Sequence, residues 1–278
     1  MLIKSDWHIH SEASFDANLT LNEIDVNSKN FGFVKFGITD HLNFNDQQFL
    51  SDLKKSKKIV QDYQSICDRV VLGVELTPIE KPLFDYIAKN GRKEGYVAPN
   101  LQTPFEIELA LTKSELQAFG IRYTIGASHW RVDVPNARYL EPDLNACIKE
   151  WHRQQMFLAC DDRVTILGHP WDNSKKLWYE DFSIIPKSMN NELACALKEN
   201  NKYVECNGAF FKVTTASEKF RNQYAEFMRE LFEKGIKVVY GSDSHHEYVD
   251  LHGNTEKYLT KVGFKEGDIS EIAESDLW

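Results

Sequence analysis

The sequence predicts an α/β protein whose parallel strands close, or nearly close, into a barrel surrounded by helices. Short runs of β-branched and aromatic residues recur along the chain, and a stretch with helical periodicity follows each of them. The runs are almost continuously apolar, which is typical of strands buried on both faces of a parallel sheet. Seven such runs are too many for a single nucleotide-binding half, but they suit a β/α barrel.

Each expected strand leads to side chains that bind metal ions in other proteins. The runs cover residues 2–3, 33–38, 70–74, 123–125, 164–167, 203–204 and 236–240. The side chains that follow them are His8 and His10, Asp40 and His41, Glu75, His129, His169, Glu205 and Asn207, and Asp243 and His245. Because functional groups of β/α barrels lie at the carboxyl ends of the strands, we expect these side chains to meet at one end of the barrel.

Helix signals lie between the strands. Thr20 is expected to cap a helix, with Glu23 at the capping-box position. Helical periodicity predicts further helices over residues 50–66, 144–158, 191–197 and 217–232. Gly235 is a plausible stop for the last of them.

One segment, residues 80–118, is longer than a crossover helix requires. Its residues 89–95 are polar and contain glycine, so we expect a surface excursion there. The sequence allows two interpretations of this segment: a lid over the site or an insertion without a function. The whole chain, residues 1–278, is expected to form one domain around this excursion.

Composition excludes several classes of function. The chain has 33 Lys and Arg against 42 Asp and Glu, a formal charge of −9, and no basic stripe, which disfavours a nucleic-acid partner. No apolar run is long enough to span a membrane. Five cysteines without a CxxC pair, and no leader-like N-terminus, predict a cytoplasmic protein with free thiols. The oligomeric state is not predicted.

The metal-ligand candidates form a set too large for a single ion. In a strand, residues two apart share a face, so His8 and His10 present their imidazoles side by side. The full set comprises His8, His10, Asp16, His41, Glu75, His129, His169, Asp243 and His245. Imidazoles and carboxylates without thiolate suit Zn²⁺, Mn²⁺ or iron. We therefore predict two to three divalent ions that share a bridging carboxylate.

Seven short motifs resemble those of a known family. "HIHSEASFD", "GITDH", "GVE", "GASHW", "LGHP", "VECN" and "GSDSH" occur in the order of the motifs of the PHP (polymerase and histidinol phosphatase) family. The resemblance implies a distorted seven-stranded (β/α)7 TIM-like barrel. It also implies a trinuclear metal centre that hydrolyses phosphoesters with a metal-bound hydroxide.

The resemblance also implies roles for individual residues. One ion would be held by His8, His10, Glu75 and Asp243; a second by Glu75, His129 and His169; and a third by Asp16, His41 and His245. Glu75, Asp243 and His245 are the expected catalytic residues. Asp40 would orient an imidazole or cap a helix, and both readings are open.

Within the family, the chain is most similar to stand-alone histidinol-phosphate phosphatases. In those enzymes a glycine and a basic residue that holds phosphate follow a Glu-x-Asn motif. Here the motif Glu205-Cys206-Asn207 precedes Lys212, which would take the place of that basic residue. Arg131 is a second candidate for binding phosphate, and each of the two could equally be an ordinary surface cation.

The expected function is hydrolysis of a small phosphorylated substrate, a phosphomonoester. A phosphodiesterase or exonuclease of the same family is one alternative, although no basic channel is visible. An amidohydrolase-type C–N hydrolase is another, although no lysine stands beside the ligands to bridge metals. The third alternative is a non-catalytic binding module in which the metals are only structural.

Overall fold

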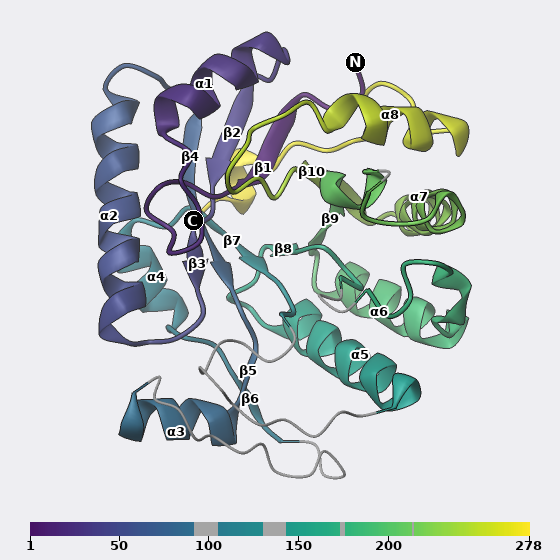
Figure 1. Cartoon of the computed structure of the whole chain (residues 1–278), viewed down its shortest axis with the longest axis horizontal. Helices are drawn as coiled ribbons and strands as arrows, with labels where there is room; N and C mark the ends of the chain where they lie inside the picture. Colours follow the sequence, from purple (N-terminus) through teal and green to yellow (C-terminus); the bar gives the residue numbers. More distant parts are fainter. Residues whose placement is uncertain (92–104, 130–142, 173–175, 213) are drawn as a thin grey trace.

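A computed structural model describes residues 1–91, 105–129, 143–172, 176–212 and 214–278 of the chain. Seven parallel strands form one sheet in the order β1-β2-β4-β7-β8-β9-β10 (Figure 1). They are β1 (Ser5–Ile9), β2 (Lys35–Ile38), β4 (Val70–Leu76), β7 (Tyr123–Gly126), β8 (Ile166–Leu167), β9 (Tyr203–Asn207) and β10 (Lys237–Gly241). A short strand, β3 (His41–Leu42), adds to β4. Six of these seven strands overlap an apolar run, whereas β1 begins two residues after the run at residues 2–3.

The first and last strands meet, so the sheet is nearly closed. Asp243 N donates to His8 O at 2.8 Å, and His10 N donates to Ser244 O at 2.9 Å. Ile9 forms an isolated parallel bridge with Ser244. The sheet is therefore the nearly closed seven-stranded β/α barrel that the sequence predicts.

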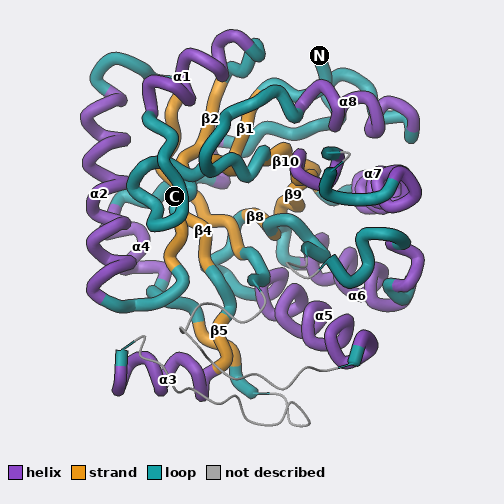
Figure 2. Tube along the Cα trace, viewed as in Figure 1, coloured by secondary structure: helices purple, strands orange, loops and turns teal. Residues whose placement is uncertain are grey.

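Helices lie around the outside of the barrel (Figure 2). They are α1 (Leu21–Asn30), α2 (Gln47–Gln64), α4 (Lys113–Phe119), α5 (Leu144–Cys160), α6 (Lys187–Glu199), α7 (Glu218–Glu233) and α8 (His252–Lys261). The capping box of Thr20 and Glu23 is present at the start of α1. Gly235, with φ of 85°, follows the end of α7 as expected. The prediction for α6 was too short, because this helix begins directly after Pro186.

Successive side chains of a strand point to opposite faces, so the apolar side chains of the sheet form two separate clusters. The interior of the barrel is filled by Trp7, Val71, Tyr123, Ile125, Ala127, Ile166, Tyr203, Val239 and Ile272. Tyr123 is fully buried and donates its hydroxyl to Trp7 O at 2.6 Å. Gly37 and Gly73 leave room for this ring, since a Cβ at either position would overlap it.

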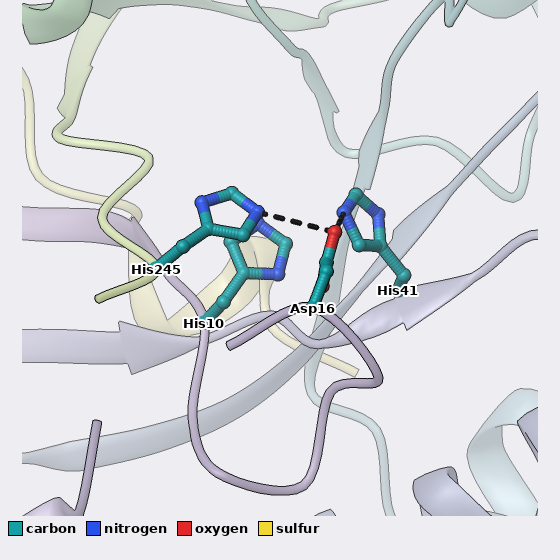
Figure 3. A group of neighbouring side chains, drawn as sticks. All are labelled: His10, Asp16, His41 and His245. Atoms are coloured by element: carbon teal, nitrogen blue, oxygen red, sulfur yellow. Dashed lines mark ion pairs between the residues drawn. The ribbon is translucent and has the colours of Figure 1, made fainter. Parts of the chain in front are cut away.

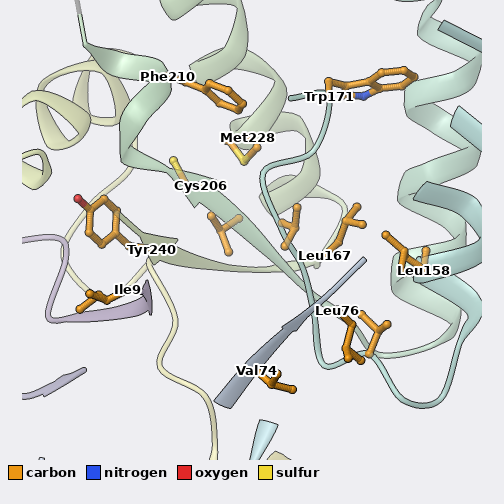
Figure 4. Close-up of a cluster of buried hydrophobic side chains, with 14 of the residues drawn as sticks. Ile9, Val74, Leu76, Leu158, Leu167, Trp171, Cys206, Phe210, Met228 and Tyr240 are labelled. Carbon is orange, nitrogen blue, oxygen red and sulfur yellow. The ribbon is translucent and has the colours of Figure 1, made fainter. Parts of the chain in front are cut away.

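The opposite faces of the strands pack against the helices. Val74 and Leu76 on β4, Cys206 on β9 and Tyr240 on β10 belong to this outer cluster (Figure 4). Their neighbours in the chain point into the barrel instead. The alternation explains why the apolar runs are continuous, because both faces of every strand are covered.

The last residues of the chain cover the amino ends of the strands. Ser270 N donates to Val238 O at 2.7 Å, and Trp278 N donates to Arg122 O at the same distance. Ile272 enters the interior cluster. A short helix, η3 (Glu274–Asp276), lies between these contacts. The amino end of the barrel is thereby closed, which leaves the carboxyl end for a site.

The expected excursion contains its own secondary structure. β5 (Ile79–Glu80) and β6 (Ile107–Glu108) pair antiparallel, and α3 (Lys81–Asn90) follows β5. Residues 92–104 lie outside the described part of the chain. Whether the segment acts as a lid therefore stays a prediction. In the described residues no helix has the length and apolar character needed to cross a membrane.

Candidate metal centre

All nine predicted metal ligands lie at the carboxyl end of the barrel. His8, His41 and Glu75 are in strands β1, β3 and β4. The others follow the strands directly or lie in the loop after β1: His10, Asp16, His129, His169, Asp243 and His245. Because the strands are parallel and neighbouring, their ends bring together residues that are far apart in the sequence.

Glu75 lies at the centre of the group. Its carboxylate oxygens are 2.7 Å from His41 Nδ1 and 3.1 Å from His169 Nε2. Three further imidazole nitrogens lie within 3.5 Å of it, those of His8, His10 and His129. The register of β3 on β4 sets His41 opposite Glu75. One carboxylate is thus shared by five imidazoles.

The group has a buried floor and an open rim. His8, His10 and Glu75 are completely buried. The side chains of Asp16 and His129 are 33% and 29% exposed, so a ligand in solvent can reach them. Charged groups are rarely buried without partners, and here they are each other's partners.

The distances within the group fit bound cations. His8 Nε2 lies 3.1 Å from His10 Nε2, and each lies within 3.5 Å of Asp243 Oδ1. Ligands bound tetrahedrally at about 2.0–2.1 Å from zinc are separated by roughly 3.3–3.4 Å. Glu75 Oε2 is buried, and it lies 2.7 Å from His41 Nδ1 and 3.5 Å from His10 Nε2. These donors therefore have the spacing that a divalent ion requires.

The residues His8, His10 and Asp243 form a first set of possible metal ligands, and a second set shares His10 with it. His10, Asp16, His41 and His245 offer ligand atoms that all lie within 4.8 Å of one another (Figure 3). Asp16 Oδ2 lies 3.2 Å from His41 Nε2 and 3.6 Å from His245 Nε2. A third set comprises His41, Glu75 and His129. The sets overlap at His10 and His41, so the assignment of ligands to individual ions stays a prediction.

The loop after β1 holds Asp16 in place through a network of hydrogen bonds. Ser11 donates from its backbone nitrogen and its hydroxyl to the two carboxylate oxygens of Asp40, at 2.6 and 2.7 Å. Ser14 donates its hydroxyl to Asp16 at 2.7 Å. Asp40 therefore fixes this loop, and its expected role of orienting an imidazole stays a prediction. Its other expected role, capping a helix, is wrong, because helix α2 is capped by Asp46.

Opposite charges keep the central carboxylate ionised. Burial would raise the pKa of Glu75, but the charges of His41, His129 and His8 outweigh it and lower that pKa well below its usual value. Burial likewise opposes the charge of Asp243, whose pKa is lowered by His8 and His10. Both carboxylates are thus available as anionic ligands at neutral pH.

The histidines differ in the protonation that the metal-free cluster favours. Burial lowers the pKa of His10 to about 3, so this ring is neutral. For His41, burial is outweighed by Glu75 and Asp16, and the pKa rises to about 10. For His169, burial is outweighed by the hydrogen bond to Glu75, and the pKa rises to about 9. At pH 7 the last two rings carry protons that a bound cation would displace.

We expect zinc binding to the metal-free chain at pH 7 to release at least one proton. The raised pKa values of His41 and His169 mean that these protons are lost only on binding, so zinc affinity should increase as the pH rises from 6 towards 9. Calorimetric titration in buffers of different ionisation enthalpy measures the number released. A heat of binding that is identical in all buffers would contradict the expectation.

Two polar groups beside the predicted ligands were not among the predicted site residues. Glu205 and Asn207 follow a strand run, but they were not placed among the ligands. Both are buried, and Glu205 Oε1 lies 2.8 Å from His8 Nδ1. Thr77 was also missed, and its hydroxyl lies 2.9 Å from His129 Nδ1. The signal for the first two was their position at a strand end, two residues apart on one face.

Of the two candidates for binding phosphate, the structure describes only Lys212. Lys212 comes directly after η2 (Gly208–Phe211), which itself follows β9, so it belongs to the same end of the barrel as the cluster. Arg131 lies outside the described residues. Neither role is tested by the geometry.

A family model matches the chain, and solved structures share its fold. The family model described as PHP domain matches residues 6–262. A histidinol phosphate phosphatase from Lactococcus lactis, solved in complex with zinc, L-histidinol and phosphate, aligns with a TM-score of 0.70 and 16% identity over 100% of this chain and 99% of its own. A provisionally assigned histidinol phosphatase from Listeria monocytogenes aligns with a TM-score of 0.58 and 14% identity over 87% of this chain and 96% of its own. No curated protein sequence matches the chain.

Proposed function

The chain belongs to the PHP domain family, and from this membership we propose that it is a metal-dependent phosphatase acting on a small phosphomonoester. The observation that carries the proposal is the position of Glu75, whose carboxylate is shared by five imidazoles at the carboxyl end of the barrel. A set of imidazole and carboxylate donors of this size is typical of sites with several divalent ions.

Two to three divalent ions, Zn²⁺, Mn²⁺ or iron, would be held by the nine ligands. When bound, such ions activate water and polarise a phosphoryl oxygen. Glu75 would keep neighbouring cations at a fixed separation, because one carboxylate offers each of two ions an oxygen. Asp243 and His245 lie at the rim, with side chains 20% and 26% exposed, where a substrate can reach them. These three remain the proposed catalytic residues.

Phosphate would be bound by cations at the rim. Lys212 and Arg131 are the proposed candidates, because a phosphomonoester carries about two negative charges at neutral pH. The net charge of −9 makes such local cations more necessary, since a distant anion is repelled by the chain as a whole.

A substrate similar to histidinol phosphate is favoured by the neighbour from Lactococcus lactis, which binds L-histidinol and phosphate. This chain aligns with that structure over its whole length. The acidic composition also favours a small substrate over an oligonucleotide. We also propose that the protein is located in the cytoplasm.

The proposal is tested by a substrate comparison on protein reconstituted separately with Zn²⁺, Mn²⁺ and Fe²⁺. We expect kcat/KM to be higher for p-nitrophenyl phosphate and histidinol phosphate than for bis-p-nitrophenyl phosphate or a short single-stranded oligonucleotide. Efficient trimming of the oligonucleotide with negligible monoester turnover would make a nuclease the better description.

The same assay examines the proposed phosphate contact. Lys212→Ala should raise KM for the monoester, with kcat falling only if the contact strengthens in the transition state. Lys219→Ala is the matched control, because Lys219 is an exposed lysine seven positions further along the chain that forms an ion pair with Asp181. Equal effects of the two substitutions would remove Lys212 from the site.

A further inference from the structure

Glu205 is a buried carboxylate that none of the donor sets above includes. It projects from β9 into the barrel and is only 1% exposed. Its oxygen Oε1 lies 2.8 Å from His8 Nδ1, and its oxygen Oε2 accepts a hydrogen bond from the backbone nitrogen of His169. A single side chain thus contacts two of the proposed ligand residues, each through an atom other than the Nε2 that lies beside Glu75.

The first contact determines how His8 presents its ring. A carboxylate accepts hydrogen bonds, so Nδ1 of His8 must carry the proton. The other nitrogen, Nε2, is then the atom that would bind a cation in place of its own proton, and it lies within 3.5 Å of His10, Glu75 and Asp243. A carboxylate on the far nitrogen also makes an imidazole a stronger ligand.

The second contact holds a backbone conformation that is otherwise unfavourable. His169 has φ of 22°, a positive value that a residue with a side chain rarely adopts. The hydrogen bond from its nitrogen to Glu205 anchors the turn after β8. In this conformation the ring of His169 reaches Glu75, with Nε2 at 3.1 Å from the carboxylate.

The neighbouring strand leaves room for this carboxylate. A Cβ at Gly241 on β10 would overlap the Glu205 carboxylate and lie 2.6 Å from His8 Cβ. The position of Glu205 therefore depends on a glycine beside it. Asn207, two residues further along β9, adds a contact with its amide nitrogen 3.4 Å from Asp243 Oδ2.

We propose that Glu205 is a positioning residue of the metal centre, which orients His8 through its ring and His169 through its backbone without binding an ion itself. The inference rests on the proposed metal centre and does not depend on the proposed substrate. It assigns to one carboxylate the support of two ligands that both contact Glu75 Oε1.

The test compares zinc affinity in Glu205→Gln and Glu205→Met. Glutamine keeps one acceptor oxygen, so its amide nitrogen must face a donor, either His8 Nδ1–H or the nitrogen of His169. Methionine removes both acceptors at a similar length. Because partners of ligands typically contribute 10–100-fold to metal affinity, we expect a loss of about 10-fold or more for glutamine and a larger loss for methionine.

Affinity is measured on the metal-free proteins by competition with a chromophoric chelator, with no substrate present. Glu271→Gln is the matched control, since Glu271 accepts a hydrogen bond from Ser5 at 2.5 Å at the opposite end of the barrel. This variant should bind zinc like the wild type. Wild-type zinc affinity in Glu205→Gln would overturn the proposal.

A second measurement keeps the proposal testable if the variants do not fold. In the zinc-loaded wild type, ¹⁵N spectra of the imidazoles should show His8 coordinated through Nε2 with its proton on Nδ1. Coordination through Nδ1 would overturn the role of Glu205. Failure of the proposed function gives a different result, because the absence of phosphatase activity would leave these zinc measurements unchanged.

Discussion

Replacing Glu75 with glutamine should lower kcat/KM for a phosphomonoester on the order of 100-fold or more, because partners that only orient ligands already contribute 10–100-fold. Glutamine keeps nearly the same volume but removes the negative charge and one anionic oxygen. Five imidazoles would then surround a neutral amide. Neighbouring cations would repel each other with less compensation, so the metal content should fall together with the activity.

The measurement combines steady-state kinetics with elemental analysis of the purified variant. Glu12→Gln serves as the control, because Glu12 is exposed on the loop between His10 and Asp16 and should change neither quantity. A Glu75→Gln variant with wild-type kcat and a full complement of metal would show that the proposed mechanism is wrong.

Truncating Tyr123 to alanine should cost about 3–5 kcal/mol in the free energy of unfolding, the usual range for a large buried ring. Tyr123 is fully buried in the interior of the barrel and forms an edge contact with Trp7, with ring centroids 5.5 Å apart. The cavity would open directly between β2, β4 and β7, where Gly37 and Gly73 have no side chains that could fill it.

Urea denaturation of the metal-free protein measures this effect without a contribution from bound ions. Tyr123→Phe separates volume from hydrogen bonding, because it keeps the ring but leaves Trp7 O without the donor at 2.6 Å. We expect the phenylalanine variant to lose less stability than the alanine variant. A loss below about 1 kcal/mol for alanine would mean that the interior is not packed around this ring.

The local sequence was sufficient to predict the strands and the residue types at their ends. The run that precedes Glu75, residues 70–74, has no polar side chain because β4 is buried on both faces. His8 and His10 were predicted to present their imidazoles together from their spacing alone, and their Nε2 atoms lie 3.1 Å apart. Such features depend on the period of a strand, which is written into adjacent residues.

At bulges and turns the side chains point in directions that strand periodicity alone does not predict. β1 has a shift of register between Asp6 and Ile9, so Trp7 fills the barrel interior while His8 joins the metal centre. Asp40 was one candidate for a helix cap, but Asp46 caps α2, and Asp40 accepts hydrogen bonds from Ser11, 29 positions away. The covering of the amino end by the last residues of the chain had no signal in the strand pattern.

What the sequence by itself determined was the set of strand-end imidazoles and carboxylates and the barrel that gathers them. Only the tertiary structure decided which of them touch. Glu205 and His8 are 197 positions apart, and their contact exists because β9 and β1 face the same interior across β10, where Gly241 lets them approach. The same closure makes His10 and His41 members of two donor sets each. Local periodicity sets the face on which a side chain lies, but the distance between two faces depends on strand order, register and the volume of the residues between them.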